Sequence, residues 1–379
     1  MIDCKGKTIE SLFKPFTLNN LFIKNRVLMA PMTRKKSPNN ELNDENVSYY
    51  KKRIKGGVGM IVTEGICIDS IGSFGYENTP SFCQRKSLDK WYELVDFAHQ
   101  NNCRIFPQLW HVGSVRRVGM PPNIKDPSLA PSAIIHPYQT LQGENQYGKP
   151  SLPTAMTIDD IKRCIDDFVE ASYLAKKIGF DGIELHAAHS YLIDQFFWSV
   201  TNKRTDQYGG DCLSQRTLFA EEIIAGIKQV CGHAFPISLR ISHWKFGDFN
   251  AKDAYKPEIL AHFLQNLVSA GVDIFHCSAH KFDKPDYPPS TLTYSGWVKK
   301  LSNLPTVAVG SIGLDKNFYE SFNHIPTNIQ PLDKIINMLD DECDLIALGR
   351  TLLADPEWPN KVKAGDFQSI VPFDPAYLK

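Results

Sequence analysis

The stretch Phe180-Asp-Gly-Ile-Glu-Leu-His-Ala-Ala-His-Ser-Tyr-Leu-Ile-Asp-Gln-Phe-Phe197 decides the fold, because an apolar strand leads directly into two histidines and a tyrosine. A parallel strand that ends in polar side chains is typical of repeated β/α proteins, which bind ligands at that end of the sheet. We predict that His186, His189 and Tyr191 belong to an active site there. Two imidazole donors and a weak acid suit a substrate carbonyl that becomes an enolate.

Two other interpretations of this cluster remain open. His-x-x-His can supply zinc ligands, and Glu184 shares the strand face of His186. The zinc-protease order His-Glu-x-x-His is absent, and of the cysteines only Cys164 and Cys212 lie near the stretch, so we expect no metal. The other interpretation buries both histidines as hydrogen-bonded core residues, but a polar cluster at a strand terminus rarely serves packing.

Composition excludes several classes of protein. Lys plus Arg and Asp plus Glu both total 42, so the balanced charge predicts no nucleic-acid partner, and 42% hydrophobic residues support a buried core. No apolar run approaches the roughly 18 residues of a membrane span, and the first residues lack a signal core, so we expect a cytoplasmic protein without membrane contact. The cysteines are odd in number, scattered and without a Cys-x-x-Cys pair, which disfavours disulfide frameworks, zinc ribbons and iron–sulfur clusters. They are Cys4, Cys67, Cys83, Cys103, Cys164, Cys212, Cys231, Cys277 and Cys343.

Short apolar segments alternate with helical patterns along the whole chain, which is the rhythm of a β/α repeat. Strands are predicted at residues 26–30, 58–64, 104–109, 181–186, 236–241, 273–277, 306–310 and 344–349. Helices are predicted at residues 45–55, 88–101, 158–178, 216–230, 257–270, 295–301 and 332–339.

Near-continuous apolar strands separated by helices favour a closed parallel barrel, and no Gly-x-Gly-x-x-Gly follows any strand to support a Rossmann site. We therefore expect one (β/α)8 TIM-barrel domain over residues 1–379. Residues 112–156 and 187–215 are too long for plain connections, and both should overhang the mouth at the C-terminal ends of the strands.

The chain resembles the old yellow enzyme family of flavin-dependent ene-reductases nearly from end to end. Residues 12–27 resemble the family's opening β-hairpin and first strand, and Ala-Pro-Met-Thr-Arg follows at residues 30–34. Further matches are Gln-Leu-Trp-His-Val-Gly at 108–113, the cluster of His186, His189 and Tyr191, and the segments 202–210, 238–240, 309–311 and 348–356. Each piece alone is modest, but all of them in order are specific.

The resemblance implies a bound FMN at the barrel mouth and NAD(P)H as its reductant. By this carry-over Ala30, Pro31, Met32, Thr33 and Gly65 line the flavin, and Thr33, in place of a cysteine, indicates the threonine branch of the family. Gln108 suits the pyrimidine edge of the flavin, and Arg240 faces its N1 and C2 carbonyl, although an internal ion pair of Arg240 remains open.

The phosphate end is predicted from the last two strands. Gly310 and Gly349 end them, where such barrels often bind phosphate through backbone N–H groups, and Arg350 can add a charged clamp. Trp110 is expected as a wall facing the substrate, with a core position as the alternative. The segments 242–246 and 280–284 depart from the family pattern and put the identity of the substrate in doubt.

The expected reaction is the NAD(P)H-dependent reduction of an activated alkene such as an α,β-unsaturated carbonyl, with His186 and His189 binding the carbonyl oxygen and Tyr191 donating the proton. A rival type on the same barrel carries an iron–sulfur cluster and a second nucleotide domain. The cysteine spacing and the roughly 30 residues after Arg350 disfavour it. A flavin-binding sensor, or a general NAD(P)H:acceptor oxidoreductase without alkene reduction, is the alternative function. The physiological substrate, the choice of NADH or NADPH and the oligomeric state are left open.

Overall fold

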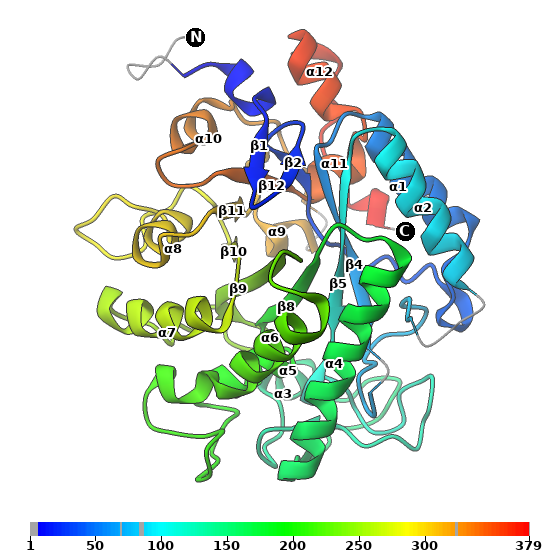
Figure 1. Ribbon diagram of the computed structural model, residues 1–379, viewed down its shortest axis with the longest axis vertical. Helices are drawn as coiled ribbons and strands as arrows, with labels where there is room; N and C mark the ends of the chain where they lie inside the picture. Colours follow the sequence, from blue (N-terminus) through cyan, green and yellow to red (C-terminus); the bar gives the residue numbers. More distant parts are fainter. Residues whose placement is uncertain (1–6, 69, 83–86, 323–324, 379) are drawn as a thin grey trace.

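The computed structural model describes residues 7–68, 70–82, 87–322 and 325–378, and within these ranges eight parallel strands close into a barrel (Figure 1). Cys4 and Cys83 lie outside the described residues. Around the barrel the strands follow the order β10, β11, β12, β3, β4, β5, β8 and β9, so that each strand lies beside its neighbour in the repeat. They are β3 (Val27–Met29), β4 (Met60–Cys67), β5 (Arg104–Trp110), β8 (Ile183–His189), β9 (Ile237–Lys245), β10 (Ile274–Ser278), β11 (Thr306–Val309) and β12 (Leu345–Leu348).

The predicted helices are present on the outside of the barrel. The longest is α4 (Ile158–Ile178), where Thr157 caps the N-terminus by accepting the N–H of Asp160 at 3.1 Å, and Gly179 ends the helix with a φ of +102°. The other predicted helices are α1 (Asp44–Lys55), α2 (Leu88–Gln100), α6 (Leu218–Cys231), α7 (Pro257–Ala270), α8 (Tyr294–Ser302) and α10 (Asp333–Met338). Helix α6 contacts both α4 and α7.

Short elements occupy the segments for which no regular structure was predicted. They are the helices α3 (Pro137–Gln142), α5 (Leu192–Phe197), α9 (Phe318–Phe322), α11 (Arg350–Ala354) and α12 (Trp358–Ala364), with the strand pair β6 (Leu129–Ala130) and β7 (Thr154–Ala155). Among the described residues, no helix combines the length and the apolar character that crossing a membrane requires.

The predicted N-terminal hairpin is present, and it closes the barrel at the end opposite the active-site cluster. Its strands β1 (Phe16–Leu18) and β2 (Leu21–Ile23) pair antiparallel. Leu18 and Ile23 pack against interior side chains such as Phe106, and the two are 2% and 0% exposed. Burial of side chains of this size stabilises the fold by about 2 kcal/mol each.

Three strands run at least three residues further than the sequence pattern predicted, and one of them, β4, continues to Cys67 beyond its predicted end at Glu64. The prediction ended the fourth barrel strand at His186 and the fifth at Ile241, whereas β8 continues to His189 and β9 to Lys245. The two extensions pair with each other, His189 opposite Lys245, after an irregularity that follows Ala187. The predicted ends were wrong because this added pairing depends on a partner strand far away in the sequence.

Candidate active site

His186, Tyr191 and Trp110 meet at the C-terminal mouth of the barrel, where β5 and β8 end. The ring centroid of Tyr191 lies 4.8 Å from that of His186 and 4.9 Å from that of Trp110, and His186 and Trp110 are nearly parallel at 6.1 Å. The Tyr191 hydroxyl lies 3.1 Å from the hydroxyl of Tyr76, which stacks on Trp110. Trp110 therefore packs against His186 and Tyr191 and is almost fully buried.

Burial keeps these groups neutral. It raises the pKa of the Tyr191 phenol well above its ordinary value, an effect that the neighbouring Tyr76 strengthens. Burial also lowers the pKa of His186 well below its ordinary value, and the positive charge of Arg240 adds to that effect. The site therefore offers a protonated phenol and an uncharged imidazole at neutral pH.

His189 is held differently from His186. Its Nε2 lies 2.8 Å from Ser278 Oγ, whereas His186 Nδ1 is buried with no hydrogen-bond partner among the described residues. The His189 ring stacks on Trp244 at a centroid distance of 4.0 Å, and Trp244 stacks in turn on His280 at 4.9 Å. The two segments that depart from the family pattern thus meet beside His189 and form one side of the mouth.

A buried carboxylate organises the barrel interior below the histidines. Glu184 is fully buried and accepts hydrogen bonds from Gln108 Nε2 at 2.9 Å, Ser238 Oγ at 2.9 Å and His276 Nδ1 at 2.8 Å. Burial alone would raise the pKa of Glu184, but the charge and hydrogen bond of His276, with Arg240, hold it below the ordinary value. Because an ionised carboxylate only accepts, Gln108 must present its nitrogen to Glu184, which leaves its amide oxygen available as an acceptor.

Arg240 provides the test of whether a flavin fits this interior. It is 8% exposed, and its Nε has no hydrogen-bond partner among the described residues. Glu184 acts on it through its charge, but no ion pair joins the two in the described part of the chain. A buried guanidinium in this state calls for an acceptor, and the N1 and C2 carbonyl of a flavin would supply one. Arg240 as a donor and the amide oxygen of Gln108 as an acceptor together fit the pyrimidine end of FMN.

The other residues predicted to contact FMN include several at or just after the ends of barrel strands. Ala30 ends the β3 pairing by donating its N–H to the Leu348 carbonyl at 2.9 Å, and the chain then leaves the barrel through Pro31, Met32 and the exposed Thr33. Gly65 lies directly under Trp110, because a Cβ there would come within 2.4 Å of the indole ring. The structure thus places Gly65 against the ring of Trp110.

At the phosphate end, Gly310 is required by close packing. Its φ is +149°, and a Cβ would approach the Ala279 carbonyl oxygen to 2.5 Å. Gly349 has more room, with Met32 Sδ at 3.4 Å from the position of a Cβ. A cavity of about 420 Å³ opens beside Gly310 and Ser311, lined by three lysines and three aspartates among other residues. Because these charges balance, the cavity by itself does not select an anion.

Arg350 is anchored to the loop after β11. Its guanidinium donates to Ser311 Oγ at 2.8 Å and to the carbonyl oxygens of Lys316 and Asn317 at 2.8 and 3.0 Å. Burial lowers the pKa of Arg350 to about 10. The residue therefore shapes the loop that should hold the phosphate, in addition to any direct contact with it.

The sequence pattern did not identify the residues that hold other side chains of the site in place. Ser238 and His276 were not singled out, and Glu184 was considered only as a metal ligand. An acid in the middle of an apolar strand was the available signal, because such a residue needs buried partners. Strand register then brings them together, with Glu184 opposite Gln108 and Ser238, and Arg240 opposite His276. No group of three or more His, Cys, Asp or Glu side chains in the described ranges could hold a metal ion.

These features together define the class of flavin-binding oxidoreductase barrels. The barrel is closed and parallel, and its mouth contains an unpaired buried arginine, an oriented glutamine and a histidine–tyrosine cluster. Residues 11–368 match the model of the NADH:flavin oxidoreductase / NADH oxidase family. The chain belongs to this family, which is the old yellow enzyme family expected from the sequence, and FMN is its cofactor.

Individual relatives agree with this assignment. The chain is 32% identical over 364 residues to NADH oxidase of Thermoanaerobacter brockii, an alignment that covers 94% of this chain and 51% of that protein. It is 30% identical over 277 residues to 12-oxophytodienoate reductase 2 of Arabidopsis thaliana, covering 73% and 72% of the two chains. The chain thus spans about half the length of the first relative.

The fold agrees with solved structures as well. Morphinone reductase in complex with tetrahydroNAD superimposes with a TM-score of 0.79 at 27% identity, and the superposition covers 97% of this chain and 94% of that one.

Proposed function

We propose that residues 1–379 form one FMN-binding domain that reduces an activated alkene such as an α,β-unsaturated carbonyl at the expense of NAD(P)H. FMN, when bound, supplies hydride transfer from the nicotinamide to the β-carbon of the alkene. The observation that carries the proposal is the contact of Tyr191 with His186 and Trp110, together with the unpaired Nε of Arg240 on the strand beside His186. Relatives named cinnamate reductase and 12-oxophytodienoate reductase support the substrate class.

The two histidines are proposed to hold the carbonyl oxygen of the substrate. His186 Nδ1 has no hydrogen-bond partner in the described part of the chain, so no contact there fixes which ring nitrogen carries the proton, and the imidazole is proposed to donate to the ligand. The Ser278 hydroxyl can donate to Nε2 of His189, which would place the proton on Nδ1 and direct it at the same oxygen. A well-placed donor to a developing oxyanion accelerates reactions by about 3 kcal/mol.

Tyr191 is proposed as the proton donor to the α-carbon. Its raised pKa keeps the phenol protonated, and the Tyr76 hydroxyl at 3.1 Å can return a proton to it after each turnover. Arg240 is proposed to stabilise negative charge on the flavin, and Thr33 to face its C4 carbonyl as in the threonine branch.

Anaerobic stopped-flow spectroscopy on the FMN-loaded protein tests this function. We expect NADPH or NADH to bleach the flavin, and 2-cyclohexenone to restore its colour rapidly under nitrogen. A sensor would show no rapid reoxidation, and a general acceptor oxidoreductase would be reoxidised by a dye but not by the enone. Either result would overturn the proposal.

A further inference from the structure

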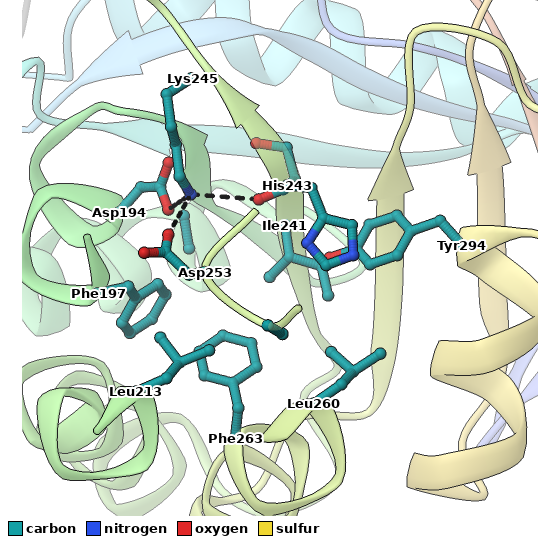
Figure 2. A pocket seen from close by; sticks show the side chains of 13 residues that line it. Asp194, Phe197, Leu213, Ile241, His243, Lys245, Asp253, Leu260, Phe263 and Tyr294 are labelled. Atoms are coloured by element: carbon teal, nitrogen blue, oxygen red, sulfur yellow. Dashed lines mark hydrogen bonds and ion pairs between the residues drawn. The ribbon is translucent and has the colours of Figure 1, made fainter. Parts of the chain in front are cut away.

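We propose that Asp194 and Lys245 are positioning residues, which fix the turn that presents His189 and Tyr191 to the substrate. The inference rests on the proposed function, in which Tyr191 donates a proton. It concerns a buried ion cluster behind the active site, formed by Asp194 on α5, Lys245 at the end of β9 and Asp253 in the following loop (Figure 2).

The turn after β8 has an unfavourable backbone conformation. His189 and Ser190 have φ values of +61° and +62°, a left-handed conformation that non-glycine residues seldom adopt twice in succession. Such a conformation persists only where surrounding contacts hold it. Tyr191 comes directly after these two residues, so its direction depends on this turn.

The carboxylate of Asp194 holds this turn in place through a hydrogen bond to its backbone. Asp194 Oδ2 accepts the backbone N–H of Ser190 at 2.6 Å, and Asp194 Oδ1 accepts from Lys245 Nζ at 2.5 Å. The side chains of Asp194 and Lys245 are 2% and 3% exposed, so water does not compete for these contacts. Asp194 therefore connects the strained turn to the end of β9.

Lys245 keeps that carboxylate ionised. Burial raises the pKa of Asp194 to about 6, and the charge of Lys245 opposes the rise. Lys245 Nζ also donates to the Ser242 carbonyl at 3.2 Å and lies 3.4 Å from Asp253. Figure 2 draws Lys245 between the carboxylates of Asp194 and Asp253. Without Lys245, two buried carboxylates would face each other, and Asp194 would tend to take up a proton.

The ion cluster of Asp194, Lys245 and Asp253 is also connected to His189 through residues of β9. The Ser242 hydroxyl accepts the N–H of His189 at 3.0 Å, and Trp244, next to Lys245, stacks on the His189 ring. A shift of the β9 end would therefore move the imidazole together with the tyrosine.

A matched pair of isosteric variants tests the inference, Asp194→Asn and Asp253→Asn. Each removes one negative charge beside Lys245, but only Asp194 contacts Ser190. We expect Asp194→Asn to slow enone reduction by the reduced protein about 10²-fold, the loss typical of a displacement near 1 Å. It should also weaken the charge-transfer band formed with 4-hydroxybenzaldehyde, while FMN reduction by NADPH stays within about threefold of wild type. Asp253→Asn should stay within about threefold in all three measurements.

Equal losses in the two variants, or losses that follow their melting temperatures, would overturn the positioning role. If Asp194→Asn does not fold, the double variant Lys245→Met with Asp253→Asn has the same net charge as wild type and removes the ion pair that connects Asp194 to the end of β9. It should show at least a tenfold loss confined to enone reduction, and a wild-type rate would overturn the inference.

Tyr191→Phe, measured alongside, separates the two proposals. If Tyr191→Phe reduces the enone at the wild-type rate, the proton-donor role of Tyr191 is wrong, and absence of enone reduction by the wild-type protein would mean that the proposed function itself is wrong. If Tyr191→Phe is slow and Asp194→Asn is not, only the positioning role is wrong.

Discussion

Substitution of Glu64 by glutamine should remove a pH-dependent part of the protein's stability. Glu64 lies on β4 next to Gly65, is 1% exposed, and accepts the backbone N–H of Arg34 at 3.0 Å and the Tyr50 hydroxyl at 3.4 Å. Burial raises the pKa of Glu64 from 4.5 to about 7 despite these contacts.

The sign and size of the effect follow from this difference. Because the folded state holds the proton more tightly than the unfolded state, the contribution of Glu64 to stability is complete below pH 4.5 and is lost as the pH rises through about 7. At about 1.36 kcal/mol per pH unit, the difference amounts to about 3 kcal/mol. With an unfolding entropy of about 0.8 kcal/mol/K for a chain of this length, the melting temperature should change by about 4 °C.

Thermal melts of the FMN-loaded protein between pH 4.5 and pH 8 measure this effect. We expect Glu64→Gln to lose less stability over that interval than wild type, while Glu45→Gln, at an exposed site on α1, should follow wild type. Parallel curves for Glu64→Gln and wild type would show that Glu64 does not titrate in this range.

The remaining predictions concern the cofactor site. Glu184→Gln leaves one neutral amide facing three donors, so we expect a loss of about 3 kcal/mol in stability and weaker FMN binding, measured by melts and by flavin fluorescence titration; unchanged FMN affinity would contradict the role given to Gln108. Arg240→Met should lower the FMN reduction potential in a potentiometric titration, because the cation that stabilises the reduced ring is gone; an unchanged potential would place Arg240 away from N1. Arg350→Ala should weaken FMN binding more than stability, and a loss of stability alone would limit Arg350 to holding the loop after β11.

Much of the fold follows from local sequence. The apolar strands and amphipathic helices have the periods that burial imposes, so most of the barrel strands, and helices such as α4 and α7, were predicted to within a residue or two. The ends of β8 and β9 were not, because His189 and Lys245 extend the strands only by pairing with each other. Short helices such as α5 lack a full period of apolar residues and depend on tertiary contacts.

The candidate site was likewise predictable from the sequence only in part. His186, His189 and Tyr191 stand close together in the sequence, so their pattern alone indicated a site. The contacts of Glu184 with Ser238 and His276 join three strands, and the contact of Lys245 with Asp194 joins a strand to a helix. No local pattern predicts such pairs, because they depend on the register of the closed barrel.

Transient kinetics of the two half-reactions in Tyr191→Phe test the central claim most directly. Hydride transfer from the nicotinamide needs no proton from a side chain, so FMN reduction should stay near the wild-type rate, while reoxidation by 2-cyclohexenone should slow by about 10² to 10⁴-fold. Equal losses in both half-reactions would mean that Tyr191 only supports packing around Trp110 and His186. An unchanged rate of enone reduction would mean that another group or solvent supplies the proton, and would contradict the account.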